Sequence, residues 1–135
     1  MNRKIITIDG TFLAGPNKGT LLVAVAQDGK DQLVLIAFAI VESENCDSWK
    51  FFLTNLNNVF EINNNQTIIM SDRDVGLLSA INTTIPNVVK CNCVRHLAKN
   101  LKSRFRDPSS LQKFWEAAYT YEESVFDNLM LEMSL

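Results

Sequence analysis

The sequence has few of the features that mark a secreted or membrane protein. It contains three cysteines, at positions 46, 91 and 93, an odd number without the spacing of a disulfide framework. Its most apolar stretches, residues 21–26 and 33–41, are too short for a bilayer, which needs about 20 apolar residues. The N-terminus lacks the apolar segment of a secretory signal. These absences predict a reducing, intracellular compartment and no membrane partner.

Composition places the chain among ordinary globular domains. Its 135 residues are 47% hydrophobic and 21% charged, which suits one domain with a real core, expected over residues 1–135. The net charge of -2 hides an uneven distribution, because six of the 13 basic residues fall within residues 90–106. The whole-chain charge therefore says little about binding partners.

Three short apolar segments near the N-terminus are typical of strands. They occupy residues 5–9, 20–26 and 32–41, and turn-forming residues separate them. Asp28-Gly29, between the second and third segments, is a strong hairpin signal. This pattern predicts an antiparallel meander.

The rest of the chain alternates helices with short strands. Capping residues precede an amphipathic helix over residues 47–60, and strands at 67–70 and 87–90 flank a short helix over 74–81. Three further helices are expected from residue 94 onward. A helical connection between the third and fourth strands is long enough to bring the fourth back parallel to the first.

Two aspartates follow apolar strand segments, Asp9 after the first and Asp72 after the fourth. Adjacent strands lie about 4.8 Å apart, so neighbouring strands would bring both carboxylates to one divalent ion. Oxygen ligands of this kind suit Mg²⁺ or Mn²⁺. The alternative is that Asp9-Gly10 and Ser71-Asp72 are only strand-terminating turns.

Four segments, taken together and in this order, resemble the Mutator-like element (MULE) transposase domain over roughly residues 5–130. The segments are Ile8-Asp9-Gly10-Thr11-Phe12; residues 39–45 with Ser48-Trp49 and Phe52-Leu53; Ser71-Asp72-Arg73 with Gly76-Leu77 and Ala80-Ile81; and Cys93-Val94-Arg95-His96-Leu97 with Asn100-Leu101-Lys102. The resemblance implies an α/β, ribonuclease H-like fold. Its mixed five-stranded sheet has the order 3-2-1-4-5, is flanked by helices and is followed by a helical C-terminal segment.

The resemblance also implies a function, that of a catalytic-core fragment of a DNA transposase in cut-and-paste transposition. Asp9 would be the first acid and Asp72 the second of an Asp-Asp-Glu triad that holds two Mg²⁺ or Mn²⁺ ions for phosphoryl transfer. The expected partner is DNA, both transposon ends and target, in the nucleus. A homo-oligomer of the full-length transposase is compatible with this interpretation.

The third acid of the family motif is expected beyond the last residue of this sequence, because in the family it follows a helical insertion well past the Cys-x-x-His segment. We therefore expect a truncated domain with little or no transposition activity in isolation. Glu116, Glu122 and Glu123 are interpreted as solvated helix positions. Glu44 has two open interpretations: a metal-binding catalytic acid, or a charge that suits the N-terminal dipole of the first helix.

Two alternatives to an active transposase core remain open. One is a host-adopted or decayed domain that binds DNA or protein without catalysis. The other is a plain metal-dependent nuclease of the same fold, which needs a complete acid set within these residues, with Glu44 as its third member.

Cys93 and His96 match the Cys-x-x-His motif of the family. Two ligands do not complete a zinc site, which normally takes four. Cys91 is available as a third ligand, but strand alternation and the usual burial of cysteine favour a packing role for it. The sequence therefore favours a structural or DNA-positioning role for Cys93 and His96 over metal binding.

The basic segment around the same motif predicts contacts with the DNA backbone, because neutralised phosphates supply most non-specific affinity. The alternative is a solvated helix face. No zinc finger or helix-turn-helix is visible, so end recognition would come from another part of a full transposase. The predicted DNA-binding residues are Lys90, Arg95, Lys99, Lys102, Arg104 and Arg106.

Overall fold

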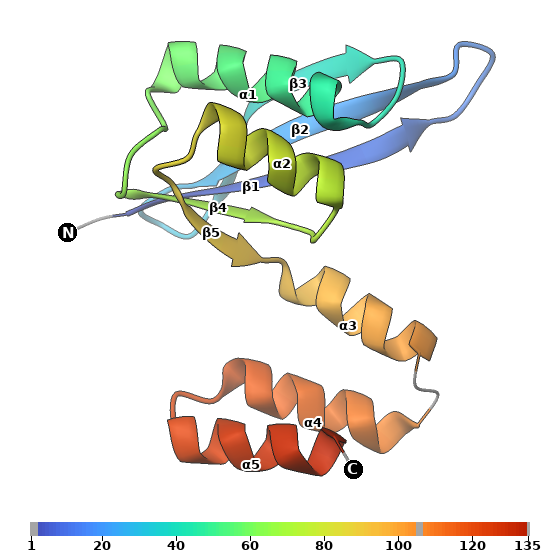
Figure 1. The fold of residues 1–135 in the computed structure, drawn as a ribbon, viewed down its shortest axis with the longest axis vertical. Helices are drawn as coiled ribbons and strands as arrows, with labels where there is room; N and C mark the ends of the chain where they lie inside the picture. Colours follow the sequence, from blue (N-terminus) through green and yellow to red (C-terminus); the bar gives the residue numbers. More distant parts are fainter. Residues whose placement is uncertain (1–2, 105–106, 135) are drawn as a thin grey trace. The chain divides into compact units, whose positions relative to one another are not determined.

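The computed structural model describes residues 3–104 and 107–134. Within the chain, two compact units form, Met1–Asn92 and Cys93–Leu135. The first unit contains a sheet with two helices, and the second contains three helices (Figure 1). The prediction of one domain over residues 1–135 stays a prediction.

The first unit is built on a mixed five-stranded sheet in the order β3-β2-β1-β4-β5, which confirms the predicted order. β1 pairs with β2, and β2 with β3, in antiparallel fashion, whereas β4 runs parallel to both β1 and β5. The strands are β1 (Lys4–Leu13), β2 (Gly19–Gln27), β3 (Leu33–Val41), β4 (Thr67–Ser71) and β5 (Val89–Asn92).

Two capped helices accompany this sheet, α1 (Cys46–Phe60) and α2 (Val75–Thr84). α1 begins after Asn45, whose side chain accepts the Ser48 N–H at 2.9 Å. α2 begins after Asp74, whose carboxylate accepts the Leu77 N–H, also at 2.9 Å. Each such cap contributes about 1 kcal/mol to stability.

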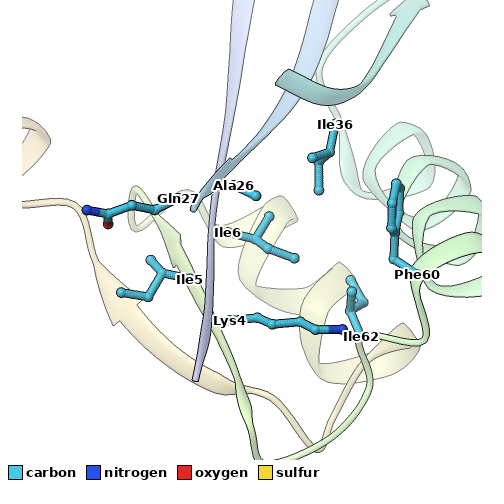
Figure 2. Close-up of a pocket in the computed structure, with 8 residues that line it drawn as sticks. All are labelled: Lys4, Ile5, Ile6, Ala26, Gln27, Ile36, Phe60 and Ile62. Carbon is cyan, nitrogen blue, oxygen red and sulfur yellow. The ribbon is translucent and has the colours of Figure 1, made fainter. Parts of the chain in front are cut away.

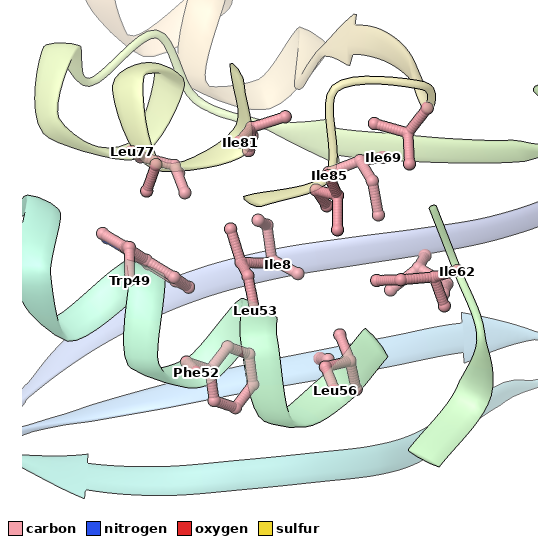
Figure 3. Packing of buried hydrophobic residues seen from close by; sticks show 14 of the residues in the cluster. Ile8, Trp49, Phe52, Leu53, Leu56, Ile62, Ile69, Leu77, Ile81 and Ile85 are labelled. Atoms are coloured by element: carbon pink, nitrogen blue, oxygen red, sulfur yellow. The ribbon is translucent and has the colours of Figure 1, made fainter. Parts of the chain in front are cut away.

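The hydrophobic core lies between the sheet and these two helices, which lie side by side (Figures 1 and 3). α1 presents a buried stripe because its apolar residues recur at intervals of three or four. Full burial of a Leu, Ile or Phe side chain contributes about 1.5–3 kcal/mol. Core residues from the sheet and helices include Ile6, Ile8, Leu22, Trp49, Phe52, Leu53, Leu56, Ile69, Leu77 and Ile81.

β1 is longer than the sequence predicted, and the interpretation of Asp9-Gly10 as a strand-terminating turn is wrong. The β1–β2 ladder pairs Asp9 with Val23 and continues to Leu13 opposite Gly19. Because this antiparallel pairing satisfies the backbone on both sides of Asp9, the strand passes straight through the aspartate.

The Asp28-Gly29 signal correctly marks the hairpin between β2 and β3, but the loop is longer than two residues. The Asp28 carboxylate accepts the N–H groups of Lys30 at 2.8 Å and Gln32 at 2.9 Å. Asp31 adopts a left-handed conformation with φ of 60°. The side chain of Asp28 thus stabilises the loop over residues 28–32 by accepting two of its backbone N–H groups.

The second unit consists of α3 (Val94–Arg104), α4 (Pro108–Tyr119) and α5 (Glu123–Ser134). α4 begins after Asp107, and hydrogen bonds donated by Ser109 hold the pKa of that carboxyl below its usual value. α4 packs against α5, where Lys113 and Glu132 form a surface ion pair at 3.3 Å. Across the described residues, no helix combines the length and the apolar character that crossing a bilayer requires.

Candidate functional site

Asp9 and Asp72 lie level with one another on adjacent parallel strands. The β1–β4 register pairs Ile6 with Ile69 and Thr7 with Met70, and two further residues along each chain lead to Asp9 and Asp72. Parallel neighbours lie about 4.8 Å apart, so the two carboxylates originate side by side. The predicted adjacency of the first and fourth strands is confirmed, although Asp9 lies within its strand and Asp72 follows the end of β4.

Backbone contacts hold both aspartates locally. One oxygen of Asp9 accepts the N–H of Gly10 at 2.9 Å, and one oxygen of Asp72 accepts the N–H of Asp74 at 3.1 Å. The Asp72 bond belongs to the turn that leads from β4 into α2. Each carboxylate therefore has a defined origin at the same edge of the sheet.

Glu44 brings a third carboxylate to this place. A Cβ atom added to Gly10 would lie 2.8 Å from both Cδ and Oε2 of Glu44, so the carboxylate fills the space that the glycine leaves. The indole N–H of Trp49 donates to Oε1 of Glu44 at 3.3 Å. Because Trp49 is fully buried in α1, this bond ties the half-buried glutamate to the core.

The pKa of Glu44 responds to burial and to the nearby aspartates. Burial raises the pKa of Glu44 above its ordinary value of 4.5, and the hydrogen bond from Trp49 partly opposes this effect. The carboxylates of Asp72, Asp74 and Asp9 raise the pKa further. Three acidic neighbours therefore act on Glu44, and a bound cation would offset their charge.

The donor set fits a hard divalent cation held by few protein ligands. Within the described residues, no group of three or more His, Cys, Asp or Glu side chains is arranged to hold a metal. Mg²⁺ is commonly bound through one or two carboxylates, with water and substrate phosphate completing its shell. Asp9 and Asp72 supply two such carboxylates, and Glu44 lies against the residue next to Asp9.

Sequence reasoning missed three contributors to this cluster. The sequence pattern places Trp49 only in the first helix, Gly10 only in a turn, and Asp74 only at a helix start, apart from the family segments that contain Trp49 and Gly10. The N-cap role of Asp74 is confirmed, but its charge also acts on Glu44. The spacing of Glu44 and Trp49 was the one available signal, because a residue just before a helix lies near that helix's first turn.

The Cys-x-x-His motif lies at the start of α3. The carbonyl of Cys93 accepts the N–H of Leu97 at 3.1 Å, and both Cys93 and His96 are half-buried. Cys91 is exposed on β5, so the expected packing role for this cysteine is wrong. β5 is an edge strand, and one side of an edge strand faces solvent.

The predicted DNA-binding residues are exposed where the structure describes them. Lys90 lies on β5 and donates to the side chain of Asn82. The predicted residue Arg106 lies outside the described residues. Glu116, Glu122 and Glu123, interpreted as solvated positions, are likewise exposed. The exposed basic residues of α3 are Arg95, Lys99, Lys102 and Arg104.

A cavity of about 150 Å³ lies away from the acids, at the opposite end of β1 (Figure 2). Ile6, Ile36, Phe60 and Ile62 contribute to its apolar lining, and Lys4 is the charged residue among those that line it. Because no carboxylate is among the described lining residues, this cavity is separate from the candidate site.

Comparison with known proteins places the chain in a family. The model of the MULE transposase domain matches residues 5–100. The structure is similar to that of the Mos1 strand transfer complex, with a TM-score of 0.50 and 15% identity over 96% of this chain and 51% of that one. The catalytic domain of Mos1 mariner transposase gives a TM-score of 0.47 and 17% identity over 96% and 76%.

No curated protein matches the sequence. The family match nevertheless covers most of the chain and includes Asp9, Glu44, Asp72 and the Cys-x-x-His motif. The chain belongs to the MULE transposase domain family and has a ribonuclease H-like fold.

Proposed function

We propose that this chain is the catalytic core of a transposase that cleaves and joins DNA strands by metal-dependent phosphoryl transfer. The observation that carries the proposal is the level position of Asp9 and Asp72 on adjacent parallel strands, with Glu44 against Gly10. Ligands of open α/β sheets bind beyond the carboxyl ends of the strands, the edge where β4 ends at Ser71 and Asp72 follows.

Asp9 and Asp72 are proposed to hold Mg²⁺ or Mn²⁺. Such ions, when bound, activate the attacking oxygen and stabilise the leaving oxygen in an in-line displacement. The two aspartates would hold the ions through their carboxylates, each of which accepts a backbone N–H. Glu44 is proposed as a further acidic group of the site. The hydrogen bond from the Trp49 indole N–H fixes the orientation of its carboxylate. Gly10 keeps open the space in which that carboxylate lies.

DNA is the proposed partner, and the nucleus is the proposed place of action. The exposed basic side chains of α3 suit the phosphate backbone, which is read by charge and not by base sequence. Membership of a transposase family and similarity to a transposase strand transfer complex support this partner.

A Mn²⁺ titration by isothermal calorimetry tests the proposal on the 135-residue chain. We expect Asp9→Asn and Asp72→Asn each to weaken Mn²⁺ binding by at least about tenfold, because loss of an outer-shell group alone typically costs about 10- to 100-fold. The matched control is Asp127→Asn, an exposed aspartate on α5 that should leave the affinity unchanged. Equal affinity in wild type and Asp72→Asn would refute the metal site and favour a domain that binds without catalysis.

A further inference from the structure

The outer edge of β3 is an open edge of the sheet in the first unit. β3 is an edge strand of the sheet, nine residues long, and its sequence contains no charge, proline or glycine. Natural edge strands usually carry such residues because a bare edge is a template for pairing with another chain. The edge of β3, which lacks these residues, is therefore open to pairing with a strand of another chain.

The side chains on this strand are apolar and largely exposed. Phe38 is 65% and Ile40 is 68% exposed, and the ladder places them opposite Val23 and Leu21 of β2. These pairs lie on the sheet face opposite the core, since the buried residues Leu22 and Ala24 occupy the alternate positions. Phe38 and Ile40 thus form an apolar rim beside the open edge.

We propose that a second copy of this chain pairs with β3 in antiparallel fashion, about a two-fold axis at Ala39. This register places Phe38 of each copy opposite Ile40 of the other on the open face. It also places Ala37 opposite Val41 on the core face. The strand is therefore complementary to itself, as an isologous interface requires.

A β-bulge selects this register over its neighbour. β3 pairs Leu35 with Val25 and Ala37 with Ala24, so Ile36 has no partner on β2 and packs against the core cluster. An axis at Phe38 would place the inward-facing Ile36 opposite the outward-facing Ile40. An axis at Ala39 uses only the regular segment of residues 37–41, in which the faces match.

Charge also permits two identical strands to meet. Glu42, the acidic residue that follows β3, would lie opposite Ile36 of the other copy. The two Glu42 residues would be about 20 Å apart along the paired strands, well beyond the Debye length of about 8 Å at physiological salt. No like charges therefore oppose the pairing of the described β3 strands.

The exposed area suits a weak dimer. Within the paired segment 37–41, Phe38 is 65% and Ile40 is 68% exposed. At roughly 150–250 Å² for a large side chain that is fully exposed, these two residues leave on the order of 250 Å² per copy. A standard interface buries about 800 Å² per partner, so we expect a weak dimer that forms only at high protein concentration.

Sedimentation equilibrium of the 135-residue chain tests the proposal, with reductant present because Cys91 is exposed. Between about 5 and 200 µM the wild type should pass from monomer to dimer. Phe38→Lys and Ile40→Lys should each weaken association at least tenfold, because each change enters the interface twice. Phe12→Lys is the matched control: Phe12 is also exposed, but it lies near the end of β1. It should dimerise like the wild type.

Hydrogen exchange supplies a second measurement that needs no variant. In the wild type, amide protection of residues 37–41 should rise with protein concentration as the edge becomes paired. A wild type that stays monomeric to about 200 µM, or dimers that survive both lysine substitutions, would overturn the proposal. Unchanged protection of residues 37–41 across a dimerising range would overturn it as well.

Discussion

Gly10→Ala is the sharpest test of how the acidic cluster is held. The added Cβ would lie 2.8 Å from Cδ and Oε2 of Glu44, closer than side-chain atoms pack, so the carboxylate must swing away. Gly10 does not adopt a positive φ, so alanine fits the backbone itself. The perturbation therefore acts on Glu44.

The magnitude follows from two opposing terms. Replacing glycine with alanine at a compatible position stabilises a protein by about 0.4–1 kcal/mol through the unfolded chain. Moving Glu44 removes the acceptor of the Trp49 indole N–H, and an unsatisfied buried donor costs about 1–3 kcal/mol. We expect Gly10→Ala to lower the free energy of unfolding by roughly 1 kcal/mol, the difference between these terms.

Urea denaturation measures this change, and Gly29→Ala is its matched control. Nothing lies within 4 Å of a Cβ at Gly29, so that variant should gain about 0.4–1 kcal/mol. In a Glu44→Ala background, Gly10→Ala should no longer lower the free energy of unfolding, because no carboxylate remains to be displaced. If Gly10→Ala stabilises the wild-type chain as much as Gly29→Ala does, the inferred packing of Glu44 on Gly10 is wrong.

Three further predictions concern charge, the core and DNA. The native pKa of Glu44 is raised, so its ionisation destabilises the fold as pH rises above 4.5, and Glu44→Gln should be more stable than wild type at about pH 7. That advantage should vanish at about pH 4, where both side chains are neutral; an equal advantage at both pH values would contradict it. Leu53→Ala should lower the free energy of unfolding by about 2–5 kcal/mol in urea titrations, since Leu53 is fully buried between α1 and the sheet; a loss under about 1 kcal/mol would argue against this core. Lys99→Gln with Lys102→Gln should reduce the salt dependence of duplex DNA binding by fluorescence anisotropy, by a slope of about 0.9 for each phosphate that is no longer neutralised. An unchanged slope would exclude these lysines as phosphate-binding groups.

The sequence determined the elements and their order because these depend on local chemistry. Helical spacing of Trp49, Phe52, Leu53 and Leu56 predicted α1, and all four side chains are buried. The acidic turn after β4 separated Asp72 from Asp74, which caps α2 as expected. The crossover through α1 is long enough for β4 to return parallel to β1, as the sequence predicted, and the pairing of these two strands confirms their adjacency.

Only the tertiary structure decided how those carboxylates are surrounded. Asp9 lies within a strand because the long β1–β2 ladder passes through it, a pairing that local turn signals in Asp9-Gly10 oppose. Glu44 reaches Gly10 although β2 and β3 separate the two residues in the sequence, and its pKa depends on burial and on acids from β1 and the β4–α2 turn. These effects arise from contacts between distant segments. Local propensity and spacing determine the helices and strands. The raised pKa of Glu44 arises only when the assembled sheet brings distant segments together.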